Sequence, residues 1–189
     1  MHKTKRLLII SVLIIIIVVL LGLLIIPKYE REFVYKTEYK EIVEKYAKEY
    51  KIDKYLIYAV MKTESNFDEK ATSNVGARGL MQIMPDAYDW VKYRLKDKRE
   101  ITYDDMYKAE YNIEYCSYML KFLLDKYSDK SLAIAAYHGG MTQVDKWISD
   151  RKIKNNGKSV KVFPSKTTGH YVKKVTKAYE SYKNLYDNK

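Results

Sequence analysis

Hydrophobic residues follow two different patterns along this chain: one unbroken block near the N-terminus, and then short stretches with helical spacing. Leu7 to Ile26 are twenty consecutive uncharged residues, and only Ser11 and Gly22 interrupt the aliphatic run. As a helix with a rise of about 1.5 Å per residue, the block spans about 30 Å, the thickness of a bilayer's hydrocarbon core. The block therefore predicts one transmembrane anchor over residues 7–26.

The residues before the block predict its orientation. Lys3, Lys5 and Arg6 lie in the tail of residues 1–6. By the positive-inside rule such a basic cluster stays in the cytoplasm. We therefore expect a single-pass protein of the cell membrane, with its N-terminus cytoplasmic and everything after Pro27 outside.

A cleaved signal peptide is the alternative interpretation of this block. Signal peptides have an apolar stretch of about 7–15 residues that ends in a small-x-small cleavage site. Here the run is longer and leads into Pro27 and Lys28 without such a site, and no cysteine lies near its end for lipid attachment. These features favour a retained anchor, followed by a short juxtamembrane linker of residues 27–36.

In the rest of the chain, apolar residues recur every three or four positions, which is the spacing of amphipathic helices. We find no internal repeat and no convincing strand pattern, so about seven short helices should pack into one mainly helical domain over residues 37–189. Asp53 and Ser131 are the expected N-caps of two of these helices. The expected helices cover residues 37–51, 53–65, 85–95, 109–127, 132–138, 144–148 and 168–186.

Glu64 stands out in this pattern because it is a carboxylate at an apolar position. Ile57, Val60, Met61 and Glu64 follow steps of three and four, so they share one helix face. Burial disfavours the charged form of a carboxyl group and raises its pKa, which is what a general acid working near neutral pH needs. A single glutamate is ordinarily a solvated residue near a helix end. The motifs that lie further along the chain count against this interpretation for Glu64.

Composition narrows the possible partners. The formal net charge is +11, and eleven Lys and Arg stand against Glu180 and Asp187 from Arg151 onward. Because this tail should lie outside the cytoplasm, a polyanionic cell wall is a better counterpart than nucleic acid, although a solvated basic surface explains the charge equally well.

Cys116 is the single cysteine and cannot form an internal disulfide, so we expect a buried, inert thiol.

Three further segments carry candidate chemistry. Residues 76–85, with Gly76, Gly79 and Gln82, place two glycines and a glutamine between two helices. Glycine lets the backbone approach a ligand closely, and glutamine can both donate and accept hydrogen bonds. Residues 135–140 place Tyr137 and His138 at a helix end, and residues 164–172 open the last helix.

Together with Glu64-Ser65, and in this order, these segments resemble the catalytic domain of the soluble lytic transglycosylases. The family's four motifs are Glu-Ser, Gly-Leu-Met-Gln followed by Met-Pro, Ala-Tyr-Asn, and a segment around Glu-Thr-x-x-Tyr-Val. In this chain they correspond to Glu64-Ser65, Gly79–Gln82, Ala136–His138 and Thr167–Val172. The resemblance covers about Lys40 to Asn184 and implies the lysozyme-like fold that these enzymes share with goose-type lysozymes.

The resemblance also implies a reaction on peptidoglycan glycan strands without metal or other cofactor. Glu64 would be the single catalytic acid/base. It would protonate the glycosidic oxygen between N-acetylmuramic acid and N-acetylglucosamine, and then help the muramyl 6-hydroxyl attack its own anomeric carbon, giving a 1,6-anhydro end. Ser73, Gln82, Met84 and Tyr137 would line the substrate groove, together with His138.

The chain departs from the family pattern at two positions. His138 replaces the usual Asn, which keeps hydrogen-bonding ability but adds a titratable ring. Thr167 replaces a Glu that helps to position substrate, which removes a negative charge. We expect both changes to affect affinity and pH dependence more than reaction type.

Other functions remain open from the sequence alone. A lysozyme-type hydrolase would cut the same bond with water and needs a second carboxylate, but Asp68, Asp86 and Asp89 are better explained as loop and helix-start acids. A non-catalytic glycan-binding or assembly module could use the same groove. A metal enzyme is not indicated, since His2, His138 and His170 form no metal-binding motif. The sequence does not predict an oligomeric state.

Overall fold

The computed structural model describes residues 2–127, 129–153, 160 and 162–187. The chain divides into two units, Met1–Thr37 and Glu38–Lys189. The division falls close to the boundary expected between linker and domain.

The N-terminal unit is helical almost throughout. Helix α1 spans His2–Tyr29 and continues into a short π-helix over Glu30–Val34. Most of the expected linker is therefore helical, and Pro27 lies inside α1 instead of ending it. Proline removes one backbone hydrogen bond, a loss that long apolar helices tolerate. By length and composition, Lys5–Val34 is apolar enough to cross a membrane.

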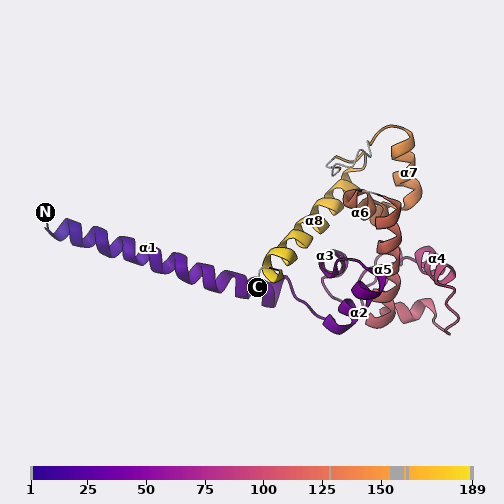
Figure 1. Cartoon of the computed structure of the whole chain (residues 1–189), viewed down its shortest axis with the longest axis horizontal. Coiled ribbons are helices and arrows are strands. Elements are labelled where there is room, and N and C mark those ends of the chain that lie inside the picture. Colours follow the sequence, from indigo (N-terminus) through magenta and orange to yellow (C-terminus); the bar gives the residue numbers. More distant parts are fainter. Residues whose placement is uncertain (1, 128, 154–159, 161, 188–189) are drawn as a thin grey trace. The chain divides into compact units, whose positions relative to one another are not determined.

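The second unit is the helical domain that the sequence predicts (Figure 1). Every helix expected from the apolar spacing is present, with ends shifted by a few residues and a short 3₁₀ helix, η2, in addition. Within the described ranges there is no strand, and residues 72–83 contain only two isolated antiparallel bridges. The elements are α2 Lys40–Tyr50, α3 Lys54–Glu64, α4 Pro85–Leu95, η2 Tyr103–Tyr107, α5 Ala109–Lys126, α6 Lys130–Gly139, α7 Met141–Ser149 and α8 Lys166–Tyr186.

Helix α3 lies at the centre of the core. All of its residues from Tyr55 to Met61 are buried, which fits a helix that is apolar on every side. Its most extensive partner is α8, and α5 in turn packs against α2 and α6. The ring of Tyr58 on α3 stacks on that of Tyr182 on α8, with centroids 5.4 Å apart. The helix that carries Glu64 is thus fixed along most of its length.

The two expected N-caps had different outcomes. Asp53 caps α3 as predicted, because its side chain accepts a hydrogen bond from the Tyr55 amide at 2.9 Å. The prediction for Ser131 is wrong: Asp129 caps α6 and accepts from the Ser131 amide at 2.6 Å. The Asp129 carboxylate also accepts from the Val160 amide at 2.7 Å, so its two oxygens each hold one backbone donor.

Candidate active site

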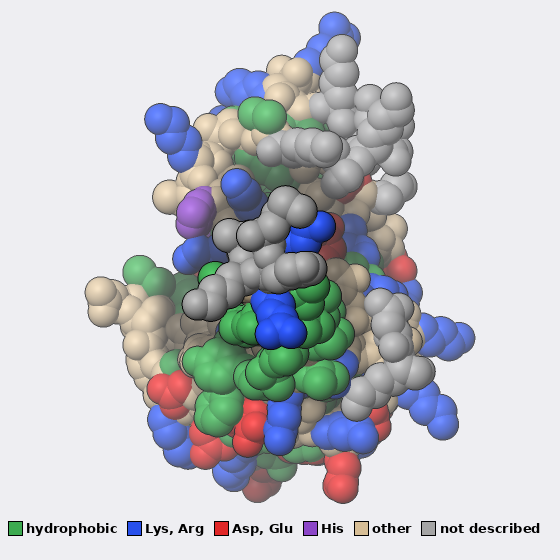
Figure 2. Space-filling model, turned by 90° about the vertical axis from the view of Figure 1, so that its left-hand side faces the viewer, with side chains coloured by type: hydrophobic (Ala, Val, Ile, Leu, Met, Phe, Trp, Pro, Cys, Tyr) green, Lys and Arg blue, Asp and Glu red, His purple; other side chains and the backbone are tan. Residues whose placement is uncertain are grey.

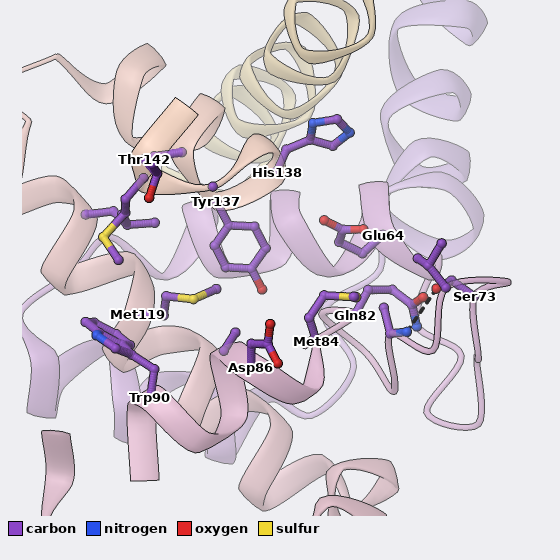
Figure 3. Close-up of a pocket in the computed structure, with 17 residues that line it drawn as sticks. Glu64, Ser73, Gln82, Met84, Asp86, Trp90, Met119, Tyr137, His138 and Thr142 are labelled. Carbon is purple, nitrogen blue, oxygen red and sulfur yellow. Dashed lines mark hydrogen bonds between the residues drawn. The ribbon is translucent and has the colours of Figure 1, made fainter. Parts of the chain in front are cut away.

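A cavity of about 690 Å³ opens on one side of the helical domain. It is formed by the end of α3, the loop before α4, and residues of α4, α5, α6 and α7 (Figure 3). Its size is that of an ordinary ligand-binding pocket. The six residues predicted from the sequence all line it: Glu64, Ser73, Gln82, Met84, Tyr137 and His138.

Glu64 is the last residue of α3, and its carboxyl group faces this cavity. Burial raises the pKa of Glu64 to about 7, against the smaller opposing effect of a hydrogen bond that Tyr171 donates to its carboxyl group. The Tyr171 hydroxyl lies 2.6 Å from Oε1. A carboxyl group with this pKa is protonated in a large fraction of molecules at neutral pH and can act as an acid there.

The loop of residues 79–82 passes beside Glu64 and adopts a backbone that requires glycine. Gly79 has a φ of +74°, and a Cβ added there would lie 2.2 Å from the Met106 carbonyl oxygen. Gln82 also has a positive φ, of 51°. The motif Gly79–Gln82 is therefore a tight turn fitted against η2 and α5, which explains its glycine in physical terms.

The other predicted motifs are attached to the backbone of this loop. Ser65 donates from its hydroxyl to the Leu80 carbonyl at 2.8 Å, and Tyr137 donates to the Met81 carbonyl at 2.8 Å. The buried Asn112 accepts from the Met81 amide at 2.8 Å and donates to the Arg78 and Met106 carbonyls. The loop is held from three sides, so the groove beside Glu64 is rigid.

Two of the predicted groove residues use part of their hydrogen-bonding capacity within this loop. The Gln82 side-chain amide donates to the Ala71 and Gly79 carbonyls, at 3.1 and 3.0 Å. Its Oε1 has no partner among the described residues, so the acceptor and not the donor remains for a ligand. The Ser73 hydroxyl accepts from the Ala77 amide at 2.9 Å and can still donate its proton.

His138 separates this cavity from a second, shallower hollow. Its ring packs on that of Tyr171, with centroids 4.5 Å apart, and its Nδ1 lies 3.4 Å from the Thr168 hydroxyl. Partial burial lowers the pKa of His138 below its ordinary value of 6.5. Thr167 and Thr168 line the second hollow, to which His138 also contributes. Both departures from the family pattern therefore lie at this boundary.

The structure adds residues that the sequence reasoning missed. Tyr171, which holds Glu64, lies in the fourth motif but was not singled out, and Asn112 gave no sequence signal at all. Asp86 is a helix-start acid as expected, in the first turn of α4, but it also lines the cavity.

Figure 3 shows the Tyr137 side chain in the middle of the cavity. On the side away from Gln82 lie Trp90, Met119 and Thr142.

Chemically, the cavity combines one carboxyl group of raised pKa with acceptors, hydroxyls and an aromatic wall. Such a set suits proton transfer to a ligand rich in hydroxyl and acetamido groups. Over the described part of the chain, no three His, Cys, Asp or Glu side chains come together as metal ligands do. Cys116 is buried, as expected, next to the cavity's Tyr137, and this burial raises the pKa of its thiol to about 12.

Comparison with known proteins gives a family match. Residues 41–160 match the profile of the family described as "Transglycosylase SLT domain". A transglycosylase of Enterobacteria phage PRD1 is 34% identical over 97 residues, which is 51% of this chain and 33% of the relative. Membrane-bound lytic murein transglycosylase C of Pectobacterium atrosepticum is 30% identical over 167 residues, 77% of this chain and 47% of the relative. The chain thus spans half or less of the length of these curated relatives.

Solved structures confirm the predicted fold. The 70 kDa soluble lytic transglycosylase of Escherichia coli superimposes with a TM-score of 0.71 at 23% identity, over 80% of this chain and 25% of that chain. The lytic transglycosylase Slt of Pseudomonas aeruginosa, as an inactive mutant, gives a TM-score of 0.66 at 21% identity over the same shares of the two chains. At these identities the likeness establishes the mainly helical, lysozyme-like architecture alone.

Proposed function

The chain belongs to the transglycosylase SLT domain family, whose profile matches more than half of it, and on this premise we propose that it is a peptidoglycan lytic transglycosylase. It cleaves the β-1,4 bond between N-acetylmuramic acid and N-acetylglucosamine and leaves a 1,6-anhydro-muramyl end. The observation that carries this proposal is the Glu64 carboxyl group, whose pKa of about 7 keeps its proton available at the wall of the cavity. The names of the relatives support the choice of murein as substrate.

The reaction needs two proton transfers, one from Glu64 and one back to it. Tyr171 engages Oε1 of Glu64, so Oε2 is the oxygen that delivers a proton to the glycosidic oxygen as the bond to the muramyl anomeric carbon breaks. The resulting Glu64 carboxylate then takes the proton of the muramyl 6-hydroxyl while that oxygen bonds to the anomeric carbon. Glu64 ends in its starting state, and no water is consumed.

The groove residues position the sugar for this step. Gln82 Oε1 can accept from an acetamido N–H or a hydroxyl, and the Ser73 hydroxyl can donate to an acetamido carbonyl. Tyr137, fixed through its hydroxyl to Met81, presents its ring to the glycan. Aromatic rings commonly provide apolar contact area of this kind beside a few polar groups in ligand sites.

Mass spectrometry of the released muropeptides tests the proposal. The full chain in detergent is incubated with purified peptidoglycan, and the products are separated without reduction. We expect muramyl ends that are lighter by one water than the products of hydrolysis. Reducing muramyl ends would show hydrolysis, and undigested peptidoglycan would favour a binding or assembly module.

Asp86 distinguishes the transglycosylase from its nearest rival, a hydrolase on the same fold. It is the carboxylate that shares the cavity with Glu64, and a hydrolase would need it to activate water. For a transglycosylase we expect Asp86→Asn to retain most of the activity and to yield the same anhydro ends. Asp89→Asn, on an exposed residue one turn further along α4 that does not line the cavity, is the matched control. A collapse of activity in the Asp86 variant alone would support the hydrolase.

His138 should give the reaction an acidic limb. Neutral imidazole can donate and accept, but its protonated form only donates and adds a cation to the cavity that holds Glu64. Once protonated, the ring can no longer accept a hydrogen bond from a sugar hydroxyl or acetamido N–H, so it should hold the substrate less well. Because burial lowers the pKa of His138 below its ordinary value, this decline in activity should set in only at a pH lower than 6.5. Activity should also fall above pH 7 as Glu64 loses its proton.

The His138→Asn variant restores the residue usual in the family and should lose the acidic limb while keeping the decline above neutral pH. The measurement is a pair of pH–rate profiles on purified peptidoglycan, with circular dichroism at each pH as the control. If the profiles of the wild type and the variant coincide from pH 5 to 8, His138 serves only in packing.

We further propose that residues 7–26, within the apolar helix Lys5–Val34, are a retained single-pass anchor with the helical domain outside the cytoplasm. The exposed apolar helix and the basic residues Lys5 and Arg6 at its start support this topology. We expect the protein to stay in the membrane fraction at full mass and its domain to be digested by protease added to spheroplasts. A soluble fragment starting near Lys28 would identify a cleaved signal sequence instead.

A further inference from the structure

Helix α8 segregates its positive charge onto its outer face. Between Asp150 and Glu180 the chain has nine Lys and Arg and no Asp or Glu. The four lysines of this stretch that lie in α8 are all exposed, whereas residues such as Tyr171 and Val175 on the inner face are buried. The helical period therefore produces a basic stripe on one face. The stripe consists of Lys166, Lys173, Lys174 and Lys177, with the exposed His170 among them.

The lysines of the stripe have few acidic neighbours on their own helix, where Glu180, three residues after Lys177, is the one Asp or Glu. Elsewhere lysines pair with carboxylates, as in Lys54 with Glu44 and Lys126 with Asp145. Among the described residues, no lysine of the stripe takes part in an ion pair. Lys173 and Lys177 stand four residues apart, where like charges repel and weaken a helix. Other exposed lysines, such as Lys40 and Lys96, also lie outside the ion pairs of the described residues, but they are scattered. The feature that distinguishes the stripe is that its unpaired lysines gather on one helix face, as they would on a surface used for binding.

The stripe begins at the edge of the groove. Ser165, Thr167 and Thr168, on either side of Lys166, line the second hollow, which His138 separates from the cavity of Glu64. From Lys166 to Lys177 the stripe runs about 17 Å along α8. Figure 2 shows basic side chains gathered around a histidine in the upper part of one face, whereas most visible acidic side chains lie in the lower part.

We propose that the basic stripe binds a phosphodiester polymer attached to the cell wall while the glycan strand lies in the groove. This inference rests on the proposed function, because it requires the domain to face the wall. Cations on successive turns of a helix match a linear polymer with one phosphate per repeat. A flat anionic membrane fits less well. A bilayer against the stripe would lie close to the second hollow, and so to the groove in which the glycan strand has to lie. The consequence is that such polymers direct the enzyme to the glycan strands that carry them.

Binding can be measured separately from cleavage. The full chain carrying Glu64→Gln is held in nanodiscs of zwitterionic lipid, which hide the anchor, and is sedimented with three partners. These are purified walls with their phosphodiester polymer, the same walls after hydrofluoric acid has removed it, and vesicles of anionic lipid. The test variant replaces Lys166, Lys173, Lys174 and Lys177 with Gln. The control replaces the exposed lysines Lys40, Lys48, Lys96 and Lys98, which changes the net charge equally and lies outside α8.

We expect the test variant to bind intact walls at least about tenfold more weakly than the parent, given the usual contribution of each lysine near an anionic surface. Stripped walls should bind parent and variant equally, and the control variant should behave as the parent does. High salt should abolish the difference, because the screening length falls from about 10 Å at 0.1 M to about 3 Å at 1 M.

Other outcomes would overturn the proposal. An equal loss in the control variant would show a general charge effect, and an equal loss on stripped walls would assign the stripe to the peptidoglycan itself. A loss confined to the vesicles would make it a membrane-facing surface. Because the chain in this assay is inactive by design, a failure here leaves the proposed cleavage untouched, and a failure of cleavage leaves this result standing.

Discussion

Glu64→Gln should reduce cleavage of purified peptidoglycan by about 10²–10⁴-fold, the usual contribution of general acid catalysis. The amide has nearly the same shape as the protonated carboxyl group, but it cannot deliver a proton to the glycosidic oxygen. Nor can it take the proton of the muramyl 6-hydroxyl in the second step. Tyr171 can still donate to the amide oxygen, so the side chain should keep its place. The rate of muropeptide release, measured against the wild type at pH 6, gives the result.

The same substitution predicts an independent change in stability. Burial raises the pKa of Glu64 from 4.5 to about 7, so between these values the folded protein binds more protons than the unfolded chain. The wild-type free energy of unfolding should therefore fall as pH rises through this window. The Gln variant lacks this loss. Its free energy of unfolding, compared with that of the wild type at the same pH, should therefore be more favourable at pH 8 than at pH 5. Thermal unfolding of both proteins at the two pH values checks this prediction.

For the activity prediction, a Gln variant that releases muropeptides at nearly the wild-type rate would show that Glu64 is not the catalytic acid.

The fold was largely predictable because most of its helices have a clear apolar period and end at strong signals. Asp53 at the start of α3 is a good example, since its capping role follows from local sequence alone. The errors concern the ends of helices, where local signals compete. Asp129 and Ser131 are both capping residue types two positions apart, so the local sequence does not decide between them; Asp129 caps α6, and its carboxylate also holds the distant Val160 amide. The anchor was expected over residues 7–26, and the helix that contains it continues through Pro27 to Tyr29.

The site was predictable where motifs marked it, and less so where the fold alone brings residues together. Glu64 and Gln82 belong to motifs, and both line the cavity. Asn112 and Trp90 lie on α5 and α4 at positions with no distinguishing neighbours, so only the packing of these helices reveals their roles. Tyr171 is 107 positions from Glu64 in the chain, and no local pattern could have shown that its hydroxyl contacts the acid.

Gly79→Ala should cause the largest loss of stability among single substitutions in the groove. A left-handed φ of +74° costs a residue with a Cβ about 1–2 kcal/mol. In addition, the new methyl group would lie 2.2 Å from the Met106 carbonyl and 2.4 Å from the Asn112 amide nitrogen. Overpacking of this kind typically costs about 1–3 kcal/mol more, so the total is about 2–5 kcal/mol. At about 3 °C per kcal/mol for a domain of this size, Tm should fall by roughly 6–15 °C.

Gly76→Ala separates the two contributions. Gly76 has a similar φ of +88°, but a Cβ there meets nothing within 4 Å. We therefore expect only the backbone cost of about 1–2 kcal/mol and a smaller fall in Tm. Near-ultraviolet circular dichroism of the full chain in detergent follows the domain without interference from the anchor helix. Equal losses in the two variants would contradict the close approach at Gly79. A larger loss in Gly79→Ala, together with weakened muropeptide release, would show that this contact positions the loop beside Glu64.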